Sequence, residues 1–410
     1  LMRQAVEVGV DMISVTVGWQ EAPESSIGRD IPPGYWNYLS ERAKKAFPDT
    51  LITFGNRLPD PRMADECLRD GVFDYWEVCR PLLADPDLIH KAAEDRLEEV
   101  RRCIGSLNCL SRLFRDLPYT CTMNPALGHE VEPEYQVTPA TVKKKVMVIG
   151  AGPAGMECAI TAKKRGHDVT VFDKAGRIGG NLYAYAINDL ARPDDLLSVI
   201  AHYEAVAGKL GIEVRLNTEV HAKFMRSVLH QYDVCVIAAG ASIDRGRHAH
   251  VKGAERMLDA LDVAHGRVKA GQRVVVVGGG KIGLTLAEAL RKHQGAEVTV
   301  IEPAKRIAGD VKPSFKWRHA SWVEELGITC LTSTTLAEVG ADGVKVRNAK
   351  GEESFVPADT VIQADGVAPA HPLFHEFEWM IDELHGVGDA VIPRGLEQAI
   401  QEGFRLGVRL

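Results

Sequence analysis

Short apolar runs alternate with amphipathic stretches along the first hundred residues. The runs predict strands at 11–18, 50–55 and 73–79, and the stretches predict helices at 2–9, 62–70 and 87–101. Strand–helix units of this length are typical of parallel sheets with crossover helices. Because three strands cannot close a (β/α)8 barrel, we interpret residues 1–98 as the C-terminal end of a barrel whose earlier strands are not in this sequence. A small, complete α/β layer is the alternative.

The regular pattern stops in the next segment, at 99–140. Three cysteines, Cys103, Cys109 and Cys121, fall close together, and a stretch containing proline, glutamate and threonine follows them. This composition predicts an irregular linker between domains.

The clearest motif begins at Val146. An apolar strand runs into Gly150-x-Gly152-x-x-Gly155, a helical pattern follows, and a second strand ends at Asp173. The first glycine allows the tight turn, the second lets the backbone approach a pyrophosphate, and the third lets helix and strand pack closely. The N-terminus of the helix supplies N–H donors for phosphates, and the acid can accept the ribose hydroxyls. The sequence therefore predicts a dinucleotide-binding unit.

The same pattern occurs a second time. A four-valine strand leads into Gly278-x-Gly280-x-x-Gly283, and the strand at 297–302 ends at Glu302. Two such units predict two bound dinucleotides. We expect the second unit, at 251–370, to be inserted in the first, at 141–250 and 371–410.

Two further segments complete the first unit. The run 234–240 predicts a buried strand ending at Gly240, and 385–389 predicts a short strand ending in Gly388-Asp389 before an amphipathic helix at 395–406. A Gly-Asp pair at a strand end can offer an N–H to a phosphate and a carboxylate to a ribitol hydroxyl. Taken alone, Asp389 would be read as a helix cap.

Composition narrows the function classes. The chain has 410 residues, enough for two or three domains, with 45% hydrophobic residues and a net charge of −7. This charge offers no basic face for nucleic acid, and no apolar run approaches the roughly 20 residues that cross a bilayer. With no signal peptide at the start, we expect a cytoplasmic protein that acts on a small-molecule substrate, without nucleic-acid or membrane partners. It could form a homo-oligomer or meet an electron-transfer partner.

Residues 141–410 resemble the two-domain flavoprotein reductases of the glutathione-reductase type. The resemblance implies that the first fingerprint binds FAD and the inserted one binds NADH or NADPH. The FAD set would comprise Gly150, Gly152, Gly155, Asp173, Gly180, Asn181, Gly240, Gly388 and Asp389. The nicotinamide nucleotide set would comprise Gly278, Gly280, Gly283 and Glu302. The redox-active CxxC of the disulfide reductases is missing, because Cys158 and Cys235 stand apart; both are expected to be core thiols.

The first 140 residues resemble one family more narrowly. Residues 55–92 and 103–130 are similar to the barrel end and cluster loop of the family that joins 2,4-dienoyl-CoA reductase and trimethylamine dehydrogenase. In that family an Old Yellow Enzyme-type barrel binds FMN. The matching positions for the FMN phosphate are Gly55, Asn56, Arg57 and Arg80. Each arginine taken separately could instead form a surface ion pair.

The resemblance also implies an iron–sulfur cluster. Cys103, Cys109 and Cys121 match three of the four cysteines that hold a [4Fe–4S] cluster in the family, but Ser106 stands where the second belongs. Thiolates suit iron–sulfide because they are soft donors, whereas a serine oxygen is a poorer one at neutral pH. We therefore expect either a [3Fe–4S] centre or a [4Fe–4S] centre with an oxygen ligand.

Gln20 is a second departure from the family. Dienoyl-CoA reductases have a histidine that assists proton donation at the matching position. Glutamine can hydrogen-bond a substrate but cannot act as a general acid near pH 7. Gln20 is therefore the candidate catalytic residue of this chain, with a role in binding.

These resemblances imply an NAD(P)H-dependent flavin oxidoreductase of the ene-reductase type. NADH would reduce FAD, the cluster would relay single electrons, and FMN would reduce an activated C=C bond. Glu302 favours NADH over NADPH, although Lys305 and Arg306 lie near enough to reach a 2′-phosphate. One alternative is an amine dehydrogenase of the trimethylamine dehydrogenase type; in that enzyme the second fingerprint is degraded. Another is a non-catalytic electron-transfer subunit.

Overall fold

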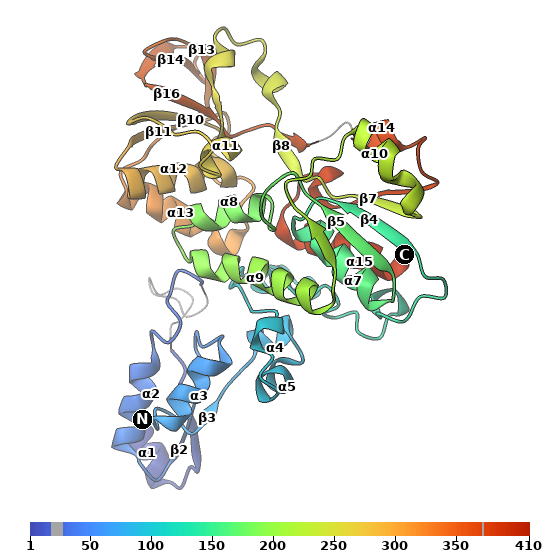
Figure 1. The fold of residues 1–410 in the computed structure, drawn as a ribbon. Coiled ribbons are helices and arrows are strands. Elements are labelled where there is room, and N and C mark those ends of the chain that lie inside the picture. Colours follow the sequence, from blue (N-terminus) through green and yellow to red (C-terminus); the bar gives the residue numbers. More distant parts are fainter. Residues whose placement is uncertain (18–27, 371–372) are drawn as a thin grey trace.

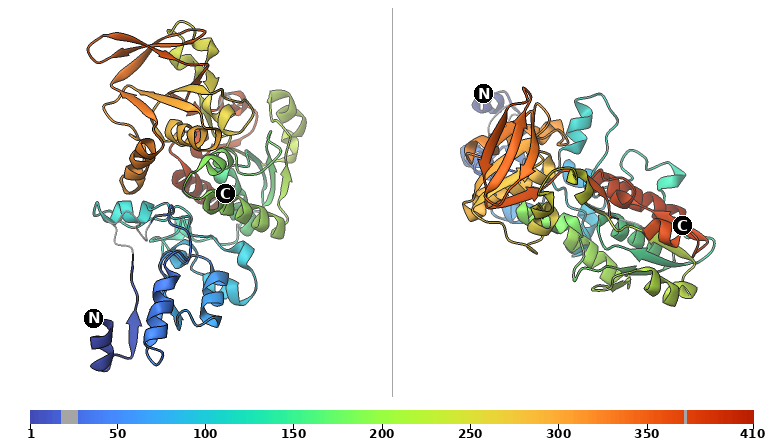
Figure 2. Two further views of the ribbon diagram at one scale, coloured as in Figure 1. Left: turned by 90° about the vertical axis from the view of Figure 1, so that its left-hand side faces the viewer. Right: turned by 90° about the horizontal axis from the view of Figure 1, so that it is seen from above.

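The computed structural model describes residues 1–17, 28–370 and 373–410. Three lobes are visible in Figure 1: an N-terminal lobe at the bottom, a lobe around β4 and α7 on the right, and a lobe around β10 and α12 at the upper left. The same separation appears in the left view of Figure 2. Among the described residues, no helix combines the length and apolar character needed to cross a bilayer.

The N-terminal lobe is a small parallel α/β layer. Its strands pair in the order β1–β2–β3, and both pairs are parallel. The elements are α1 (Met2–Glu7), β1 (Met12–Ser14), α2 (Asn37–Ala46), β2 (Leu51–Phe54), α3 (Pro61–Arg69) and β3 (Tyr75–Trp76). Buried Ile52, Phe54 and Phe73 form the centre of its core. The predicted strands 11–18 and 73–79 are correct in place but too long, because only two or three residues of each pair with a neighbour.

The predicted helix at 87–101 is wrong as a single element. It forms α5 (Leu88–Ala93) and a short 3-10 turn, η1 (Leu97–Glu99), separated by Asp95 with a φ of 53°. That left-handed conformation ends a right-handed helix. The chain folds back so that the Asp85 carboxylate accepts hydrogen bonds from the Arg101 N–H at 2.8 Å and from Lys91 at 2.7 Å. The segment that follows α4 (Arg80–Ala84) and α5 contains α6 (Asn108–Leu113) and η2 (Pro133–Tyr135).

A five-stranded parallel sheet lies at the centre of the right-hand lobe. Its strand order is β18–β7–β4–β5–β6, so the edge strand β18, near the C-terminus, pairs with β7 from the middle of the chain. The strands are β4 (Lys145–Ile149), β5 (Asp168–Phe172), β6 (Glu213–Arg215), β7 (Val234–Ile237) and β18 (Glu383–Gly386). The other elements are α7 (Pro153–Lys164), α8 (Asn181–Asn188), α9 (Pro193–Lys209), α10 (Ala222–Val228), η3 (Leu229–Gln231), α14 (Leu373–Phe377), η6 (Gly388–Ala390) and α15 (Leu396–Arg409).

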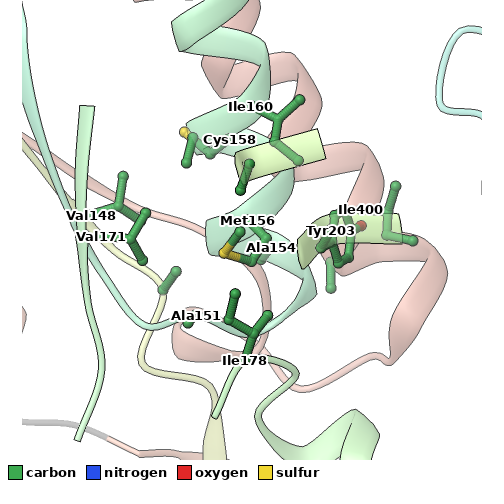
Figure 3. Close-up of a cluster of buried hydrophobic side chains, with 14 of the residues drawn as sticks. Val148, Ala151, Ala154, Met156, Cys158, Ile160, Val171, Ile178, Tyr203 and Ile400 are labelled. Carbon is green, nitrogen blue, oxygen red and sulfur yellow. The ribbon is translucent and has the colours of Figure 1, made fainter. Parts of the chain in front are cut away.

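Helix α7 is buried on nearly every side. Its apolar side chains pack between the sheet and the helices α9 and α15, as Figure 3 shows for Met156, Cys158 and Ile160 beside Val148 and Tyr203. Cys158 and, on β7, Cys235 are fully buried free thiols, as expected for core cysteines. Burial raises the pKa of each thiol to about 12.

The upper-left lobe repeats the parallel arrangement. Its sheet has the order β12–β11–β10–β16–β9, and an antiparallel sheet, β13–β14–β15, lies beside it. The strands are β9 (Leu258–Asp259), β10 (Arg273–Val277), β11 (Glu297–Glu302), β12 (Thr329–Thr332), β13 (Thr334–Val339), β14 (Gly343–Asn348), β15 (Glu353–Pro357) and β16 (Thr360–Gln363). The helices are α11 (Ala260–Ala264), α12 (Lys281–Gln294) and α13 (Pro313–Glu325).

Two strands connect this lobe to the first sheet. They are β8 (Ala241–Ile243) and β17 (Val367–Pro369), which pair in antiparallel fashion, with η4 (Arg245–His248) and η5 (Ala254–Arg256) after β8. The second sheet is thus formed by residues between β7 and β18 of the first. An α/β fold with two Rossmann-like sheets, as the sequence predicts, is confirmed.

Candidate functional site

The first glycine fingerprint forms the turn between β4 and α7. Gly150 has a φ of 113°, and a Cβ there would overlap the carbonyl of Ala238. A Cβ on Gly155 would overlap the carbonyl oxygen of Gly150. At Gly152, by contrast, no atom of the described residues other than its chain neighbours lies within 4 Å of the position of an added Cβ. The loop is therefore tight at both ends and open in the middle, where a pyrophosphate would approach.

The acid at the end of β5 lies beside this loop. The Asp173 carboxylate accepts hydrogen bonds from the N–H groups of Ala151 at 2.6 Å and Ala175 at 2.7 Å. These bonds place it at the edge of the glycine turn, where ribose hydroxyls would be accepted.

The remaining positions of the predicted FAD set lie on other elements of the lobe. Gly240 has a φ of 76°, and within the described part of the chain, its two neighbours apart, no atom lies within 4 Å of an added Cβ. Gly180 packs on Gly152, whose Cα is 3.3 Å from the Cβ position of Gly180. Asn181 at the start of α8 donates a hydrogen bond to the carbonyl of Ala241 at 2.9 Å. The open position at Gly240 and the close backbone approach at Gly180 fit a dinucleotide.

The Gly-Asp pair follows β18 in the turn η6. Gly388 has a φ of 69°, and its N–H donates to Glu402 at 3.0 Å. The carboxylate of Asp389 accepts hydrogen bonds from the N–H groups of Arg394 at 2.9 Å and Gly395 at 3.3 Å, just before α15. Both donors precede Leu396, the first residue of α15, and the N-cap of the helix is Gly395, so Asp389 holds the turn before the helix and is not the helix cap that the alternative expected.

The second fingerprint has the same geometry. Gly278 has a φ of 112° and lies against Asp365, and a Cβ on Gly283 would overlap the carbonyl oxygen of Gly278. Glu302 accepts hydrogen bonds from the N–H groups of Gly279 and Ala304, both at 2.8 Å. Gly280 differs from Gly152, because the two carboxylate oxygens of Asp310 lie 3.1 Å from its Cβ position.

One side chain on α8 lies near both fingerprint regions. Burial raises the pKa of Tyr185, and the carboxylates of Asp389 and Asp310 add to this effect. The ammonium group of Lys281, the first residue of α12, lies 5.5 Å from the centre of the Tyr185 ring. A tyrosine of the first unit therefore lies close to the first residue of α12 in the second unit.

The three predicted cluster cysteines line one small cavity, with a volume of about 20 Å³. Ser106 and Arg80 line it too, and the Ser106 hydroxyl hydrogen-bonds Thr122 at 2.8 Å. Burial raises the pKa of Cys109 and raises that of Cys121 to about 11, and the nearby Cys103 thiol adds to both shifts. The donor set of three thiols suits iron–sulfur chemistry. Within residues 1–17, 28–370 and 373–410, however, no three His, Cys, Asp or Glu side chains are arranged to hold a metal ion.

The residues matched to FMN binding lie in and after the N-terminal layer. A Cβ on Gly55 would overlap the backbone of Glu77, and the Asn56 side chain donates to the carbonyl of Val17 at 2.7 Å. Gln20 lies outside the described residues, and its proposed role stays a prediction.

Arg57 has partners of its own. Its buried guanidinium donates to the Ile31 carbonyl at 2.7 Å and pairs with Asp195 on α9 at 3.1 Å. Burial lowers the pKa of Arg57, while Asp195 opposes the shift. Arg57 therefore forms an ion pair, but a buried one instead of the surface pair that the alternative expected.

One buried ion pair was missed by the sequence analysis. Glu157, fully buried on α7, accepts hydrogen bonds from Arg101 at 2.7 and 3.0 Å and from the Tyr203 hydroxyl at 3.2 Å. Arg101 also donates to the carbonyl of Met123 at 2.9 Å, next to the cysteine cavity. Although burial alone would lower it, the Glu157 carboxylate raises the pKa of Arg101. The sequence feature that could have indicated this pair is Glu157 itself, a single glutamate within the apolar run of α7.

These sites define a protein with two Rossmann-like nucleotide-binding units in one chain. Residues 144–387 match the protein family described as "Pyridine nucleotide-disulphide oxidoreductase". The chain belongs to this family.

Two curated relatives extend over almost the whole chain. A protein named "Metal reductase" from Desulforamulus reducens is 32% identical over 438 residues, covering 99% of this chain and 64% of the relative. An "NADH oxidase" from Thermoanaerobacter brockii is 32% identical over 421 residues, covering 99% of this chain and 62% of the relative. Both relatives are oxidoreductases by name.

A solved structure is similar over the full chain. A complex of 2-naphthoyl-CoA reductase with 2-naphthoyl-CoA superposes with a TM-score of 0.94 at 34% identity, covering 100% of this chain and 62% of that one. The chain therefore spans less than two thirds of the length of these relatives.

Proposed function

We propose that this chain is the pyridine-nucleotide-accepting part of a flavin oxidoreductase, with FAD in the first unit and NADH in the second. Two complete strand–glycine turn–helix–strand units in one chain carry the proposal. The open Gly152 turn and the Asp173 carboxylate would bind the FAD pyrophosphate and ribose. The second turn and Glu302 would bind the nicotinamide nucleotide.

When bound, FAD would accept a hydride from the nicotinamide, and an iron–sulfur cluster and FMN would pass electrons onward to a substrate. Cys103, Cys109 and Cys121 would hold the cluster, with Ser106 beside its fourth position. Gly55, Asn56 and Arg80 would lie at the FMN end of the N-terminal layer, which we propose to be the end of a barrel. Arg57, already paired with Asp195, would join that end to the FAD-binding lobe.

The proposed reaction is reduction of an activated C=C bond. The similarity to 2-naphthoyl-CoA reductase over the whole chain supports an unsaturated substrate. The cinnamate reductase of Clostridium sporogenes, 32% identical over 384 residues, supports it as well. The intact second fingerprint favours this reaction over amine oxidation, because it gives the protein a site for a nucleotide reductant.

The test is an anaerobic preparation assayed for FAD, FMN, iron and sulfide, followed by stopped-flow mixing with NADH. We expect stoichiometric FAD and bleaching of its absorbance by the nucleotide. A preparation that lacks FAD, or whose FAD is not reduced by NADH or NADPH, would refute the proposal. A preparation with FAD but without iron or sulfide would refute the cluster alone.

A further inference from the structure

The two nucleotide-binding units share a loop after their second strand. Residues 174–181 read KAGRIGGN and residues 303–310 read PAKRIAGD, each directly after the acid that ends the strand. In the first unit the N–H of Gly179 donates to the carbonyl of Ala151 at 2.9 Å. In the second, the N–H of Ala308 donates to the carbonyl of Gly279 at 2.8 Å. The loops therefore attach to their fingerprints in the same way.

The last residue of the loop differs between the units. In the first unit it is Asn181, whose amide bonds the Ala241 carbonyl at 2.9 Å and the His265 ring at 3.2 Å. In the second unit it is Asp310, whose carboxylate accepts a hydrogen bond from the N–H of Lys281 at 2.8 Å. The first unit thus has a neutral side chain that bonds residues outside its fingerprint. The second unit has a carboxylate at the same loop position, and this carboxylate bonds the backbone of its own fingerprint helix.

This carboxylate lies where a nucleotide phosphate would bind. The N-terminus of α12 offers N–H donors and the positive end of the helix dipole, and both favour one negative group. Asp310 already takes the N–H of Lys281, and its oxygens lie 3.1 Å from the Cβ position of Gly280. In the first unit, no described residue apart from the chain neighbours of Gly152 has an atom within 4 Å of the Cβ position of Gly152.

We propose that Asp310 competes with the pyrophosphate of NAD(P)H for the N-terminus of α12 and thereby weakens nucleotide binding. The inference rests on the proposed function, since it concerns the nucleotide site of the second unit. A pyrophosphate and a carboxylate within a few ångströms repel each other, so binding requires Asp310 to leave the Lys281 N–H. The first unit has Asn181 at this position and is free of the competition, which suits a cofactor that stays bound.

The test compares NADH binding to the wild type and to Asp310→Asn, both loaded with FAD and reduced beforehand with dithionite so that bound NADH is not oxidised, followed by NADH fluorescence under anaerobic conditions. Asparagine keeps the size of the side chain and can still accept the Lys281 N–H through its oxygen. Because Asp310 is exposed, its charge is screened by water, and removing one unit charge at about 4 Å then corresponds to roughly a fivefold lower Kd. The difference in Kd between Asp310→Asn and the wild type should become smaller as the salt concentration rises from about 0.05 to 0.5 M, because salt screens the repulsion between Asp310 and the pyrophosphate.

Asp342→Asn is the matched control, because it makes the same change in net charge on the turn between β13 and β14. We expect its Kd to equal that of the wild type, and the FAD content of all three proteins to be equal. A Kd for Asp310→Asn that is unchanged or higher, with NADH binding to the wild type intact, would overturn the competition. If the wild type binds neither NADH nor NADPH, the proposed function itself fails, and the competition with it.

Discussion

The guanidinium of Arg101 and the carboxylate of Glu157 form two hydrogen bonds that join the cysteine segment to the helix of the first fingerprint. Arg101 belongs to the chain just before Cys103, whereas Glu157 lies two residues after Gly155. The pair therefore fixes the distance between the proposed cluster cavity and the proposed FAD site. Since Glu157 is fully buried, each group depends on the other for its charge to be compensated.

Removing one partner should destabilise the protein strongly. Glu157→Gln leaves the Arg101 guanidinium partly buried without a counter-charge, so we expect a loss of about 3–5 kcal/mol in the free energy of unfolding. The measurement is urea denaturation. Glu94→Gln, which breaks the more exposed pair with Arg96, is the control and should cost under about 1 kcal/mol. Equal losses in the two variants would show that the buried pair has no special role.

Gly152→Val should abolish FAD binding while leaving the fold intact. The Cβ of the new side chain would lie more than 4 Å from every described residue except its chain neighbours, and the side chain would occupy the path of the pyrophosphate. Flavin content after desalting measures the effect, and circular dichroism checks the fold. Gly208→Val, an exposed glycine of α9 that also has no atom within 4 Å of its Cβ position, should retain FAD. Full flavin in the Gly152 variant contradicts the assignment.

The nucleotide preference should depend on Glu302. Its carboxylate lies beside the second glycine turn, where it would bond a 2′-hydroxyl and repel a 2′-phosphate. We expect kcat/KM for flavin reduction to be higher with NADH than with NADPH. In Glu302→Gln, the ratio of the NADH value to the NADPH value should fall several-fold. A wild type that prefers NADPH would reverse the assignment and point to Lys305 or Arg306 as the phosphate partner.

Ser106→Cys should increase the iron content and the lifetime of the cluster in air. The serine lines the same cavity as the three cysteines, so the substitution supplies a fourth thiol. Iron and sulfide assays on anaerobic protein, with electron paramagnetic resonance, measure the change. Ser111→Cys adds a thiol on α6 outside the lining of the cavity and should leave the iron content unchanged. If both variants raise iron equally, the added metal is adventitious.

Stability should fall at high pH because of buried thiols. Burial raises the pKa of Cys235 to about 12, from 9.0 for an unperturbed thiol. The neutral thiol is thus favoured by folding, so its stabilisation is fully present below about pH 9 and is lost as pH rises towards 12. Cys235→Ala should reduce the slope of unfolding free energy against pH in this range. Cys79→Ala, at an exposed thiol, should keep the slope of the wild type; identical slopes for all three proteins would exclude the buried thiol as the source.

The sequence predicted best where local pattern and pairing agree. The strand at 297–302 has the predicted bounds in β11, because each of its residues is paired with a neighbouring strand and 299–301 are paired on both sides. The helix predicted at 87–101 failed because the Asp85 carboxylate holds the Arg101 N–H, a contact between residues that no periodicity links.

In the candidate site, too, local features could be predicted from the sequence and contacts between distant residues could not. Both glycine turns could be read from spacing alone, since their geometry is a property of a few adjacent residues. The Arg101–Glu157 pair joins residues far apart in sequence, and nothing in the spacing assigns one to the other. Asp310 could have been found by aligning the two loops, but its hydrogen bond to Lys281 depends on how the loop closes over α12.

The hydrogen-bonded pair of strands β8 and β17 has a consequence for how this architecture can be built. Ile243 and Val367 are register partners, so the chain leaves the first lobe and returns to it at a single point. The nucleotide-binding lobe between them is, in its connectivity, the tip of a hairpin. An inserted lobe of this kind can be exchanged, enlarged or shortened without changing the strand order of the parallel sheet into which it is inserted. The chain thus has the form of one domain spliced into a surface turn of another, a modular construction in which each part can diversify separately.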